Sequence, residues 1–518
     1  MINDYLLGMD IGTTNIKAIV INAAGQIQAK ASRKISLIMP AQHRVEQDAE
    51  QWWRNAAEIF QELKAKTGTP VFDNIRGICI SSQTVTLLPV DKAGNTLRNA
   101  IIWMDNRADE EVGYLTECIG LKRYMEIIGT RPSGTFLAGK LLWLKKNEPE
   151  VFGRTHRILQ ASSYVNYRLT GEMTMDISQA AMTQCLDRNT GRWSETVGAA
   201  IGADLDSLLP KPLPCGEIIG RVTKAAASET GLKEGIPVMA GASDCMTSMY
   251  ATGMTKIGDA GESSGTSSML FVASTMQSRP DCAVSTKPCD IEGMPYIFDA
   301  PLSSTGASIE WFLNTIGKEY EMLAAKQNIS RYDYLNLVTE NIPAGSGGVF
   351  FHPYLQGERA PLWNSHARGM FIGMTLNTTT DDLARAVLEG TAFAIRHVAE
   401  VIADEGTKIE SLRITGGGAK SRTWSKIKAS MLNVPVFITD EKCGEVPFGD
   451  ALIAGRSTGI FPDLKAALKE LVTIKEVIEP EPEWVKYYDD VFPFFKKIYA
   501  SLDDTLRNMQ DISGIINN

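Results

Sequence analysis

Two short loops rich in glycine and hydroxyl side chains have the composition of a phosphate-binding site. Gly12-Thr13-Thr14 follows the apolar run 5–9 and Asp10, and Gly265-Thr266-Ser267 occurs in the second half of the chain. Each loop lies between two runs of strand-forming residues, so we predict two β-hairpins. Neither loop opens a long amphipathic helix, as a Rossmann or Walker loop does, so hairpin amides and hydroxyls would hold the phosphate. The repetition predicts a phosphate held between two domains.

Two aspartates near these loops have the chemistry that phosphoryl transfer needs. Asp10 could orient Mg²⁺, which prefers one or two carboxylates together with phosphate oxygens, or it could only cap the turn. Asp244 follows a short predicted strand, 238–240, and could act as general base for a hydroxyl nucleophile or as N-cap of the segment 245–251. Thr266 could bond phosphate oxygens or its own loop backbone. The local sequence leaves these alternatives open.

The composition favours a soluble globular chain of two domains. The chain has 518 residues, of which 44% are hydrophobic and 22% charged, and we place the domain boundary between 1–246 and 247–518. A net charge of -9 argues against binding to nucleic acid or to an anionic membrane, since either needs a basic face. Eight cysteines without Cys-x-x-Cys spacing favour reduced thiols.

The N-terminal segment and the apolar runs predict a cytoplasmic location. Asp4 and Asp10 interrupt the first apolar segment, so we predict no secretion signal. No run approaches about 18 uncharged apolar residues, so we predict no membrane span.

The elements that must position these residues alternate between strands and helices. Asp48 to Gln51 has the pattern of a capping box that opens an amphipathic helix to about residue 66, and a buried strand, 77–81, follows it. Thr380 and Asp381 are predicted to cap a long helix. A strand at 411–415 leads into Gly416-Gly417-Gly418 and a helix at 421–432, and such glycines let the backbone approach a flat ligand closely. An aromatic segment, 484–506, is predicted to be a closing helix packed on the core.

Several further motifs follow one another along the chain. They are Asp10-Ile11-Gly12-Thr13-Thr14, Gly241 to Asp244, Ser264-Gly265-Thr266-Ser267, Gly306 to Trp311, Tyr354 to Pro361 and Gly416 to Ser421. Gly369 to Met374 is followed, after seven residues, by Asp382 to Glu389. The order of these motifs is that of the FGGY carbohydrate kinases, and the last pair, the most specific match, is similar to that family's C-terminal signature. The chain resembles the family over about residues 5–500, most closely its xylulokinase branch.

The resemblance implies an α/β, actin-like (ribonuclease H-like) fold of two domains with an active-site cleft between them. It implies ATP and Mg²⁺ as cofactors and a small sugar or polyol as acceptor, with Asp244 as the catalytic base and Asp10 with Asp244 as the metal-site residues. Nucleic acid and membrane partners are not expected, and the oligomeric state stays open, with a homodimer as one option. The implied cofactor-binding residues are Asp10, Gly12, Thr13, Thr14, Lys17, Gly265, Thr266, Gly306, Glu310, Gly417, Gly418 and Ser421.

The sequence departs from the family where the sugar would bind. Xylulokinases usually carry Gln-Met-His-Gly where this chain has Ser81 to Thr84, and Asn or Gln where it has Cys245. Both changes remove polar groups that would bond substrate hydroxyls, and a buried hydroxyl without a partner costs about 1–3 kcal/mol. We therefore predict that D-xylulose is a poor substrate. The candidate sugar-binding residues are Gln83, Trp103, Asp105, Arg107 and Cys245.

Two other classes of function fit parts of the sequence. Gly261 to Gly265 matches the Gly-x-Ser-x-Gly elbow of serine hydrolases, with Ser263 as nucleophile and His352, His366 or His397 as base. A nucleotide-binding, actin-like sensor without kinase turnover is the other alternative. The presence of both Asp10 and Asp244 favours a kinase, because a sensor needs no base.

Overall fold

The computed structural model describes residues 4–291, 293–440, 443 and 445–516. The strands of the first half are β1 (Tyr5–Ile11), β2 (Asn15–Asn22), β3 (Ile27–Lys34), β4 (Ile38–Ala41), β5 (Arg44–Gln47), β6 (Ile75–Ser82), β7 (Leu88–Val90), β8 (Ala100–Ile101), β9 (Arg157–Leu159), β10 (Met175–Asp176), β11 (Leu186–Asp187), β12 (Arg192–Trp193), β13 (Pro212–Leu213), β14 (Ile218–Arg221) and β15 (Pro237–Ser243). Its helices are α1 (Ala49–Thr67), α2 (Thr69–Phe72), α3 (Asp109–Ile119), α4 (Leu121–Ile128), α5 (Leu137–Asn147), α6 (Pro149–Arg154), α7 (Ala161–Thr170), α8 (Ile177–Met182), α9 (Glu195–Ile201), α10 (Leu205–Leu208), α11 (Lys224–Thr230) and α12 (Asp244–Thr252).

The second half has fewer and longer elements. Its strands are β16 (Asp259–Ser264), β17 (Ser268–Ser274), β18 (Ser285–Ile291), β19 (Met294–Leu302), β20 (Phe350–His352), β21 (Met370–Ile372), β22 (Ser411–Gly416), β23 (Val436–Thr439) and β24 (Ile474–Ile478). Its helices are α13 (Thr305–Asn314), α14 (Glu319–Lys326), α15 (Arg331–Glu340), α16 (Thr380–Asp404), α17 (Arg422–Leu432), α18 (Val446–Ser457), α19 (Leu464–Leu471) and α20 (Pro482–Ile516), with 3₁₀ turns η1 (Ser346–Gly348) and η2 (Gly417–Lys420).

Two mixed sheets with related local plans form the centre of the molecule. The first has the strand order β14-β15-β6-β1-β2-β3, and the second β18-β19-β17-β16-β22-β23-β24. In each sheet an antiparallel hairpin, β1–β2 or β16–β17, carries a Gly-Thr loop, and its first strand pairs in parallel with β6 or β22. The two hairpins predicted from the sequence are therefore confirmed.

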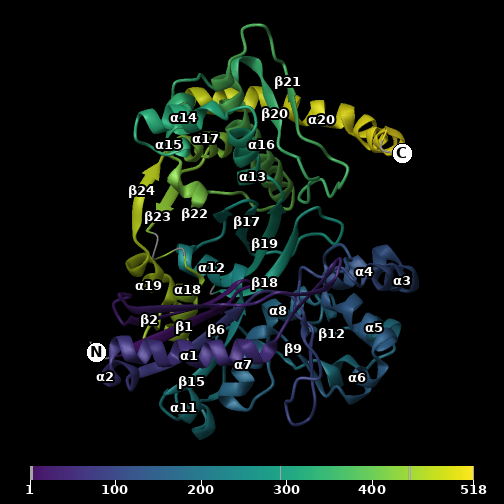
Figure 1. The fold of residues 1–518 in the computed structure, drawn as a ribbon, viewed down its shortest axis with the longest axis vertical. Helices are drawn as coiled ribbons and strands as arrows, with labels where there is room; N and C mark the ends of the chain where they lie inside the picture. The colour runs from purple at the N-terminus through teal and green to yellow at the C-terminus, as the bar shows by residue number, and fades with distance from the viewer. Residues whose placement is uncertain (1–3, 292, 441–442, 444, 517–518) are drawn as a thin grey trace.

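Helices form layers around and between these sheets (Figure 1). Helix α1 contacts α7 and α11 on the outer side of the first sheet, and α16 and α17 pack on the second half beneath α20. Between the sheets, α12 packs on α18, and α18 contacts β1, β2 and β6. Although α18 belongs to the second half of the sequence, it covers the inner face of the first sheet.

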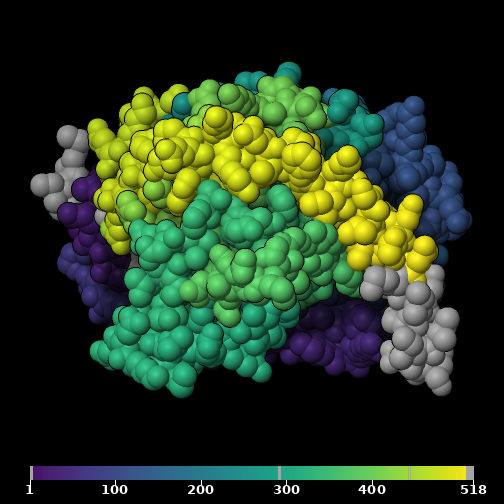
Figure 2. All heavy atoms as spheres, turned by 90° about the horizontal axis from the view of Figure 1, so that it is seen from above, coloured from purple at the N-terminus to yellow at the C-terminus, as the bar shows by residue number. Residues whose placement is uncertain are grey.

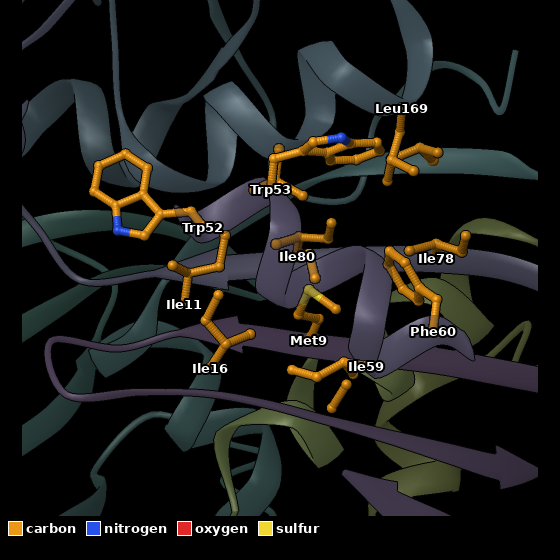
Figure 3. Close-up of a cluster of buried hydrophobic side chains, with 14 of the residues drawn as sticks. Met9, Ile11, Ile16, Trp52, Trp53, Ile59, Phe60, Ile78, Ile80 and Leu169 are labelled. Atoms are coloured by element: carbon orange, nitrogen blue, oxygen red, sulfur yellow. The ribbon is translucent and has the colours of Figure 1, made fainter. Parts of the chain in front are cut away.

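The core under α1 shows why this helix forms and where it packs (Figure 3). Trp52, Ile59 and Phe60 recur at helical spacing and are fully buried, so one apolar face of α1 is removed from water. They face side chains of the parallel strands, among them Met9 and Ile80. This packing holds β1, and with it the first Gly-Thr loop, against a rigid support.

The closing helix is confirmed and is longer than predicted. Helix α20 begins at Pro482 and ends at Ile516. Its residues Tyr488, Phe492 and Phe495 are buried against the second half, where the ring of Phe393 stacks on Phe495 with centroids 4.9 Å apart. Figure 2, seen from above, shows this helix as a yellow band across the outer face of the second half.

Two predicted helix caps differ from the structure. Asp48 caps α1 by accepting a hydrogen bond from the Glu50 amide, but the side chain of Gln51 accepts from the Ser36 amide instead of returning to the cap. Thr379, and not Thr380 or Asp381, is the N-cap of α16, and it forms a capping box with Asp382. The prediction misplaced this cap by one residue because three threonines, Thr378 to Thr380, stand side by side.

Every helix in the part of the chain that the structure describes is too short or too polar to cross a bilayer.

Candidate active site

The two candidate aspartates lie at the same edge of the first sheet. Strand β6 pairs in parallel with β1 on one side and with β15 on the other. Asp10 stands opposite Ser81, and Ser243 stands opposite Ser82, directly before Asp244. Since the carboxyl ends of parallel strands meet at one edge, the topology brings Asp10 and Asp244 together although 234 positions separate them.

Burial makes both carboxylates reluctant to ionise. Burial is the largest influence on Asp10 and, with the charge of Asp244, raises its pKa from 3.8 to about 8, while Lys17 and Ser81 act in the opposite direction. Burial also raises the pKa of Asp244. A buried carboxyl group beside a partly buried one is costly in the ligand-free protein even with the exposed Lys17 nearby, and such groups cluster at functional sites.

The carboxylate of Asp244 is not the cap of the helix that follows it. Ser243 is the N-cap of α12, and its side chain accepts from the Met246 amide at 3.4 Å. Asp244 is the first residue of the helix, and its Oδ1 accepts from the Cys245 amide at 2.7 Å. The structure therefore separates the capping role, which belongs to Ser243, from the carboxylate of Asp244.

The first Gly-Thr loop is a tight hairpin turn. The Gly12 amide donates to the Asn15 carbonyl at 3.0 Å. Thr14 is exposed at the tip of the turn. Lys17, also exposed, pairs across the hairpin with Asp10, so its charge lies beside that carboxylate.

A buried hydrogen-bond chain fixes Thr13 in this loop. Its hydroxyl donates to Gln83 Oε1 at 3.2 Å and accepts from the indole of Trp103 at 2.9 Å. The amide of Gln47 donates to the Thr13 carbonyl at 2.7 Å, and Gln83 Nε2 donates to Gln47 Oε1 at 2.7 Å. Gln83 and Trp103, two of the candidate sugar-binding residues, thus meet at Thr13. Gln47, which the sequence analysis did not select, holds them in place.

Asp105 and Arg107, which follow Trp103 in the chain, belong to a buried ion-pair network. Arg107 Nη2 bonds Asp105 Oδ2 at 2.7 Å and Glu46 Oε1 at 2.8 Å, and its guanidinium lies 4.8 Å from the ring centre of Trp143. Asp105 is fully buried and also accepts from the Val45 amide at 2.6 Å. Trp103, in contrast, is 42% exposed and presents an open aromatic surface.

The second Gly-Thr loop lies against the start of α13. The Gly265 amide donates to the Ser267 carbonyl at 3.1 Å, and the Ala307 amide donates to the Thr266 carbonyl at 2.8 Å. A Cβ on Gly306 would lie 2.1 Å from the Gly265 carbonyl oxygen, so only glycine permits this approach. The side of the loop that carries Gly265 and Thr266 is exposed.

The glycine turn after β22 packs against Ser264, at the start of the second Gly-Thr loop. Gly416 has φ +82, and a Cβ on Gly418 would lie 2.1 Å from the Ser264 hydroxyl oxygen. Gly417 faces open space. The structure thus brings Gly265, Gly306 and Gly418 together from three separate segments.

Two predicted cofactor residues are engaged with other protein groups. The Ser421 hydroxyl caps α17 by accepting from the Trp424 amide at 3.1 Å. Glu310 pairs with Arg331 at 2.5 Å and also accepts from Asn314.

A buried ion pair supports the second loop from below. Lys428 Nζ donates to both carboxylate oxygens of Glu262, at 2.8 and 2.7 Å, and both side chains are almost completely buried. Ser268 donates to the same carboxylate at 2.8 Å and bonds Thr305 at 2.7 Å. The pair thereby ties β16, β17, α13 and α17 together at the base of the loop.

The second sheet contributes an acid that the sequence analysis missed. Asp299 of β19 pairs with Phe271 of β17, a residue whose side chain belongs to the core between the sheets. Burial is the largest cause of the raised pKa of Asp244 and of the half-buried Cys245, and the charge of Asp299 raises both further, so Asp299 lies near these two residues. The signal that could have identified Asp299 from the sequence is that it is the one acidic residue in an otherwise mostly apolar strand.

The donor groups at this edge suit Mg²⁺ held jointly with phosphate oxygens. Among the described residues, no group of three or more His, Cys, Asp or Glu side chains could hold a metal ion alone. Asp10 and Asp244 supply carboxylates beside a hydroxyl-rich loop, which is the small ligand set that Mg²⁺ uses when phosphates complete its shell.

The serine hydrolase hypothesis is wrong in its geometry. Ser263 lies inside β16 of a hairpin, and not at a strand-to-helix turn. His352 stacks on Phe495 with ring centroids 4.2 Å apart, and burial lowers its pKa to about 3.

Comparison with known proteins identifies the family. Residues 5–251 match the N-terminal domain, and residues 262–458 the C-terminal domain, of the FGGY family of carbohydrate kinases. The chain is 28% identical over 510 residues to the xylulose kinase of Bacillus subtilis (strain 168), covering 96% of this chain and 97% of that protein.

Solved structures agree over nearly the whole length. The xylulose kinase of Rhodospirillum rubrum has a TM-score of 0.89 and 30% identity and covers 97% of this chain and 100% of its own. The gluconate kinase of Lactobacillus acidophilus has a TM-score of 0.88 and 25% identity, with 98% and 99% covered. These matches confirm the two-domain actin-like fold and ATP-dependent sugar phosphorylation, and they give no support to the sensor alternative. The chain belongs to the FGGY family of carbohydrate kinases.

Proposed function

We propose that this kinase transfers the γ-phosphoryl group of ATP to a terminal hydroxyl of a small open-chain sugar or polyol, with Asp244 as the general base. The observation that carries the proposal is the meeting of Asp10 and Asp244 at one edge of the first sheet, where the charge of one raises the pKa of the other. A phosphate site and a proton acceptor are both needed there for attack by a hydroxyl.

The proton acceptor has the properties that this reaction requires. Burial raises the pKa of Asp244, so its carboxylate is a stronger base than an exposed aspartate. In the proposed step, Asp244 takes the proton from the acceptor hydroxyl while the hydroxyl oxygen attacks the γ-phosphorus and the bond from that phosphorus to the β–γ bridging oxygen breaks. The Cys245 amide bonds Oδ1 and orients the carboxylate.

The nucleotide is proposed to lie along the second half. Gly265, Thr266 and Gly306 would line its phosphates, and the open backbone at Gly417 would meet the adenosine. Mg²⁺ would be held by Asp10 and the phosphate oxygens beside Gly12, Thr13 and Thr14, and when bound it offsets the charge of the transferring group.

The acceptor pocket is proposed to use Trp103 as an apolar wall and Gln83 and Cys245 as its nearest polar groups. Asp105 and Arg107 are part of the same proposed site, and their buried pairing holds the Trp103 segment in place. Relatives of this chain are named xylulose kinases and a gluconate kinase. Because Ser82, Gln83 and Cys245 replace the usual xylulokinase pattern, D-xylulose is proposed to be a poor acceptor here.

The test is a coupled assay of ADP release with a panel of pentuloses, hexuloses, tetritols, sugar acids and glycerol. Asp244→Asn should lower turnover on the best acceptor by about 10²-fold or more and leave ATP binding largely intact. Glu195→Gln is a matched control, because Glu195 is also the first helical residue after a serine N-cap and is exposed. Near-normal turnover of Asp244→Asn would reject the base. A preference for D-xylulose over the whole panel would reject the proposal on specificity.

A further inference from the structure

A cavity lies between the two halves, beside α4 and α8. It has a volume of about 290 Å³. Its walls come from α4, α8 and the β11–β12 turn of the first half and from β18 and β19 of the second, where α8 packs on β18 (Figure 1). The lining residues used below are Arg188, Thr190, Lys287 and Tyr296.

The floor of this cavity holds a lysine without a hydrogen-bond partner. Lys287 of β18 is only 4% exposed. Within the described part of the chain its ammonium makes no hydrogen bond. Burial lowers the pKa of Lys287, and the charge of Asp299 acts in the opposite direction. A buried ammonium with unfilled hydrogen bonds is costly unless a ligand supplies acceptors.

An arginine from the other half lines the same cavity. Arg188 donates from Nε to Gln277 Oε1 and from Nη2 to the Ser278 carbonyl, both at 2.7 Å, and so bridges the two halves. Its third guanidinium nitrogen, Nη1, is buried without a partner. None of the described residues that line the cavity is acidic, so its walls carry net positive charge.

We propose that this cavity binds a small anion, a carboxylate or a phosphate monoester, through Lys287 and Arg188. Such an anion supplies the acceptor oxygens that the Lys287 ammonium lacks, and charge-assisted hydrogen bonds are the stronger kind. Since Lys287 and Arg188 belong to different halves, the bound anion also links them and favours the arrangement in which the halves are together.

Two sources of this anion share the same chemistry. The group can belong to an acidic acceptor that reaches from Asp244 past Asp299 into the cavity, and this source rests on the proposed kinase function. It can also belong to a separate metabolite that binds beside the reaction centre. The cavity is the same in both cases, and the experiment separates them.

The first measurement is calorimetric titration of the full chain with inorganic phosphate, glycerol 3-phosphate and D-gluconate. It needs no turnover, so it reports on the cavity even if the proposed function fails. We expect at least one probe to bind at millimolar or lower concentration and to bind about tenfold or more weakly to Lys287→Met. No binding of any probe to the unmodified protein, or equal binding by Lys287→Met, overturns the proposal.

Two variants at Thr190 test the proposal even if Lys287→Met does not fold. Thr190 lines the cavity and is exposed, so Thr190→Asp places a carboxylate at the cavity without disturbing the core, and Thr190→Asn is its neutral control. Anion binding should weaken in the acidic variant only, because like charges repel. Equal binding by the two variants counts against the site.

The source is decided by kinetics. If the acceptor carries the anion, D-gluconate is phosphorylated, and Thr190→Asp raises its KM more than the KM of a neutral acceptor. If the anion is separate, phosphate or glycerol 3-phosphate still binds when a neutral acceptor is saturating. Either result supports the site. The site is rejected if a saturating neutral acceptor abolishes anion binding equally in the unmodified protein and in Lys287→Met, because the anion then binds in the acceptor pocket.

Discussion

Replacing Asp10 by asparagine is expected to stabilise the ligand-free protein while damaging its function. Asp10 is buried beside Asp244, and Ser81 is its nearest hydroxyl partner, at 3.5 Å. The amide keeps the size of the side chain and cannot ionise. The gain in stability should therefore grow over the pH range in which this carboxyl group ionises in the unfolded chain but stays protonated in the folded protein.

The pKa of Asp10 gives the size and direction of this effect. Its pKa is raised from 3.8 to about 8. A raised carboxyl pKa contributes stability that is complete below the unfolded value and is lost as pH rises through the folded value. One pKa unit corresponds to about 1.4 kcal/mol. Between about pH 5 and pH 8 the free energy of unfolding of the unmodified protein should therefore fall by up to about 4 kcal/mol, a loss that Asp10→Asn does not share.

Calorimetric melting in the presence of a chelator tests this reasoning. The melting temperature of Asp10→Asn minus that of the unmodified protein should increase by up to about 8 °C between about pH 5 and pH 8, at about 2 °C per kcal/mol for a domain of this size. Glu234→Gln, a change at an exposed acid, is the control. Addition of Mg²⁺ and ATP should raise the melting temperature of the unmodified protein more than that of the variant. A melting difference that is the same at both pH values would refute the reasoning.

Two further predictions concern the second half. Lys428→Met leaves the Glu262 carboxylate buried without its cation and should cost about 3–5 kcal/mol in urea unfolding, and the double variant with Glu262→Gln should recover most of it. Equal losses in the single and double variants would contradict a role for the ion pair. Gly306→Ala pushes a Cβ towards the Gly265 carbonyl and should raise the KM for ATP by about tenfold or more, whereas Gly153→Ala, whose Cβ would meet nothing within 4 Å, should not. An unchanged KM for ATP in Gly306→Ala would show that the two loops do not act together on the nucleotide.

Local sequence was sufficient for the parts of the site that depend on local geometry. The two hairpins followed from strand-forming runs on both sides of a Gly-Thr loop, and the turn at Gly416 followed from its three glycines. Asp10 and Asp244 could be selected because Asp10 lies near the end of β1 and Asp244 directly follows β15. In an α/β sheet, residues at strand ends gather at one edge, so these selections needed only the strands to be recognised.

Residues whose importance depends on long-range pairing could not be found in this way. Asp299 lies near Asp244 only because of the register of β19 on β17, which the sequence does not specify. Gln47 acts on Thr13 through the fold of a separate small sheet. Lys287 stands in a strand whose neighbours and cavity belong to both halves. Each role follows from topology, and one sequence carries little information about topology.

The return of α18 to the first sheet explains how the second half reaches the reacting edge. Asp450 of α18 is fully buried, and the Ser81 hydroxyl donates to its Oδ2 at 2.7 Å while lying 3.5 Å from Asp10 Oδ1. Helix α18 can approach β1 because Gly8 has no Cβ, which would lie 1.9 Å from the Pro447 carbonyl oxygen. Burial raises the pKa of Asp450, and the charge of Asp10 raises it further. Helix α18 therefore places a second buried carboxyl group at this edge, and a cation that binds Asp10 acts at once on the β1 edge and on the helix that lies between the sheets.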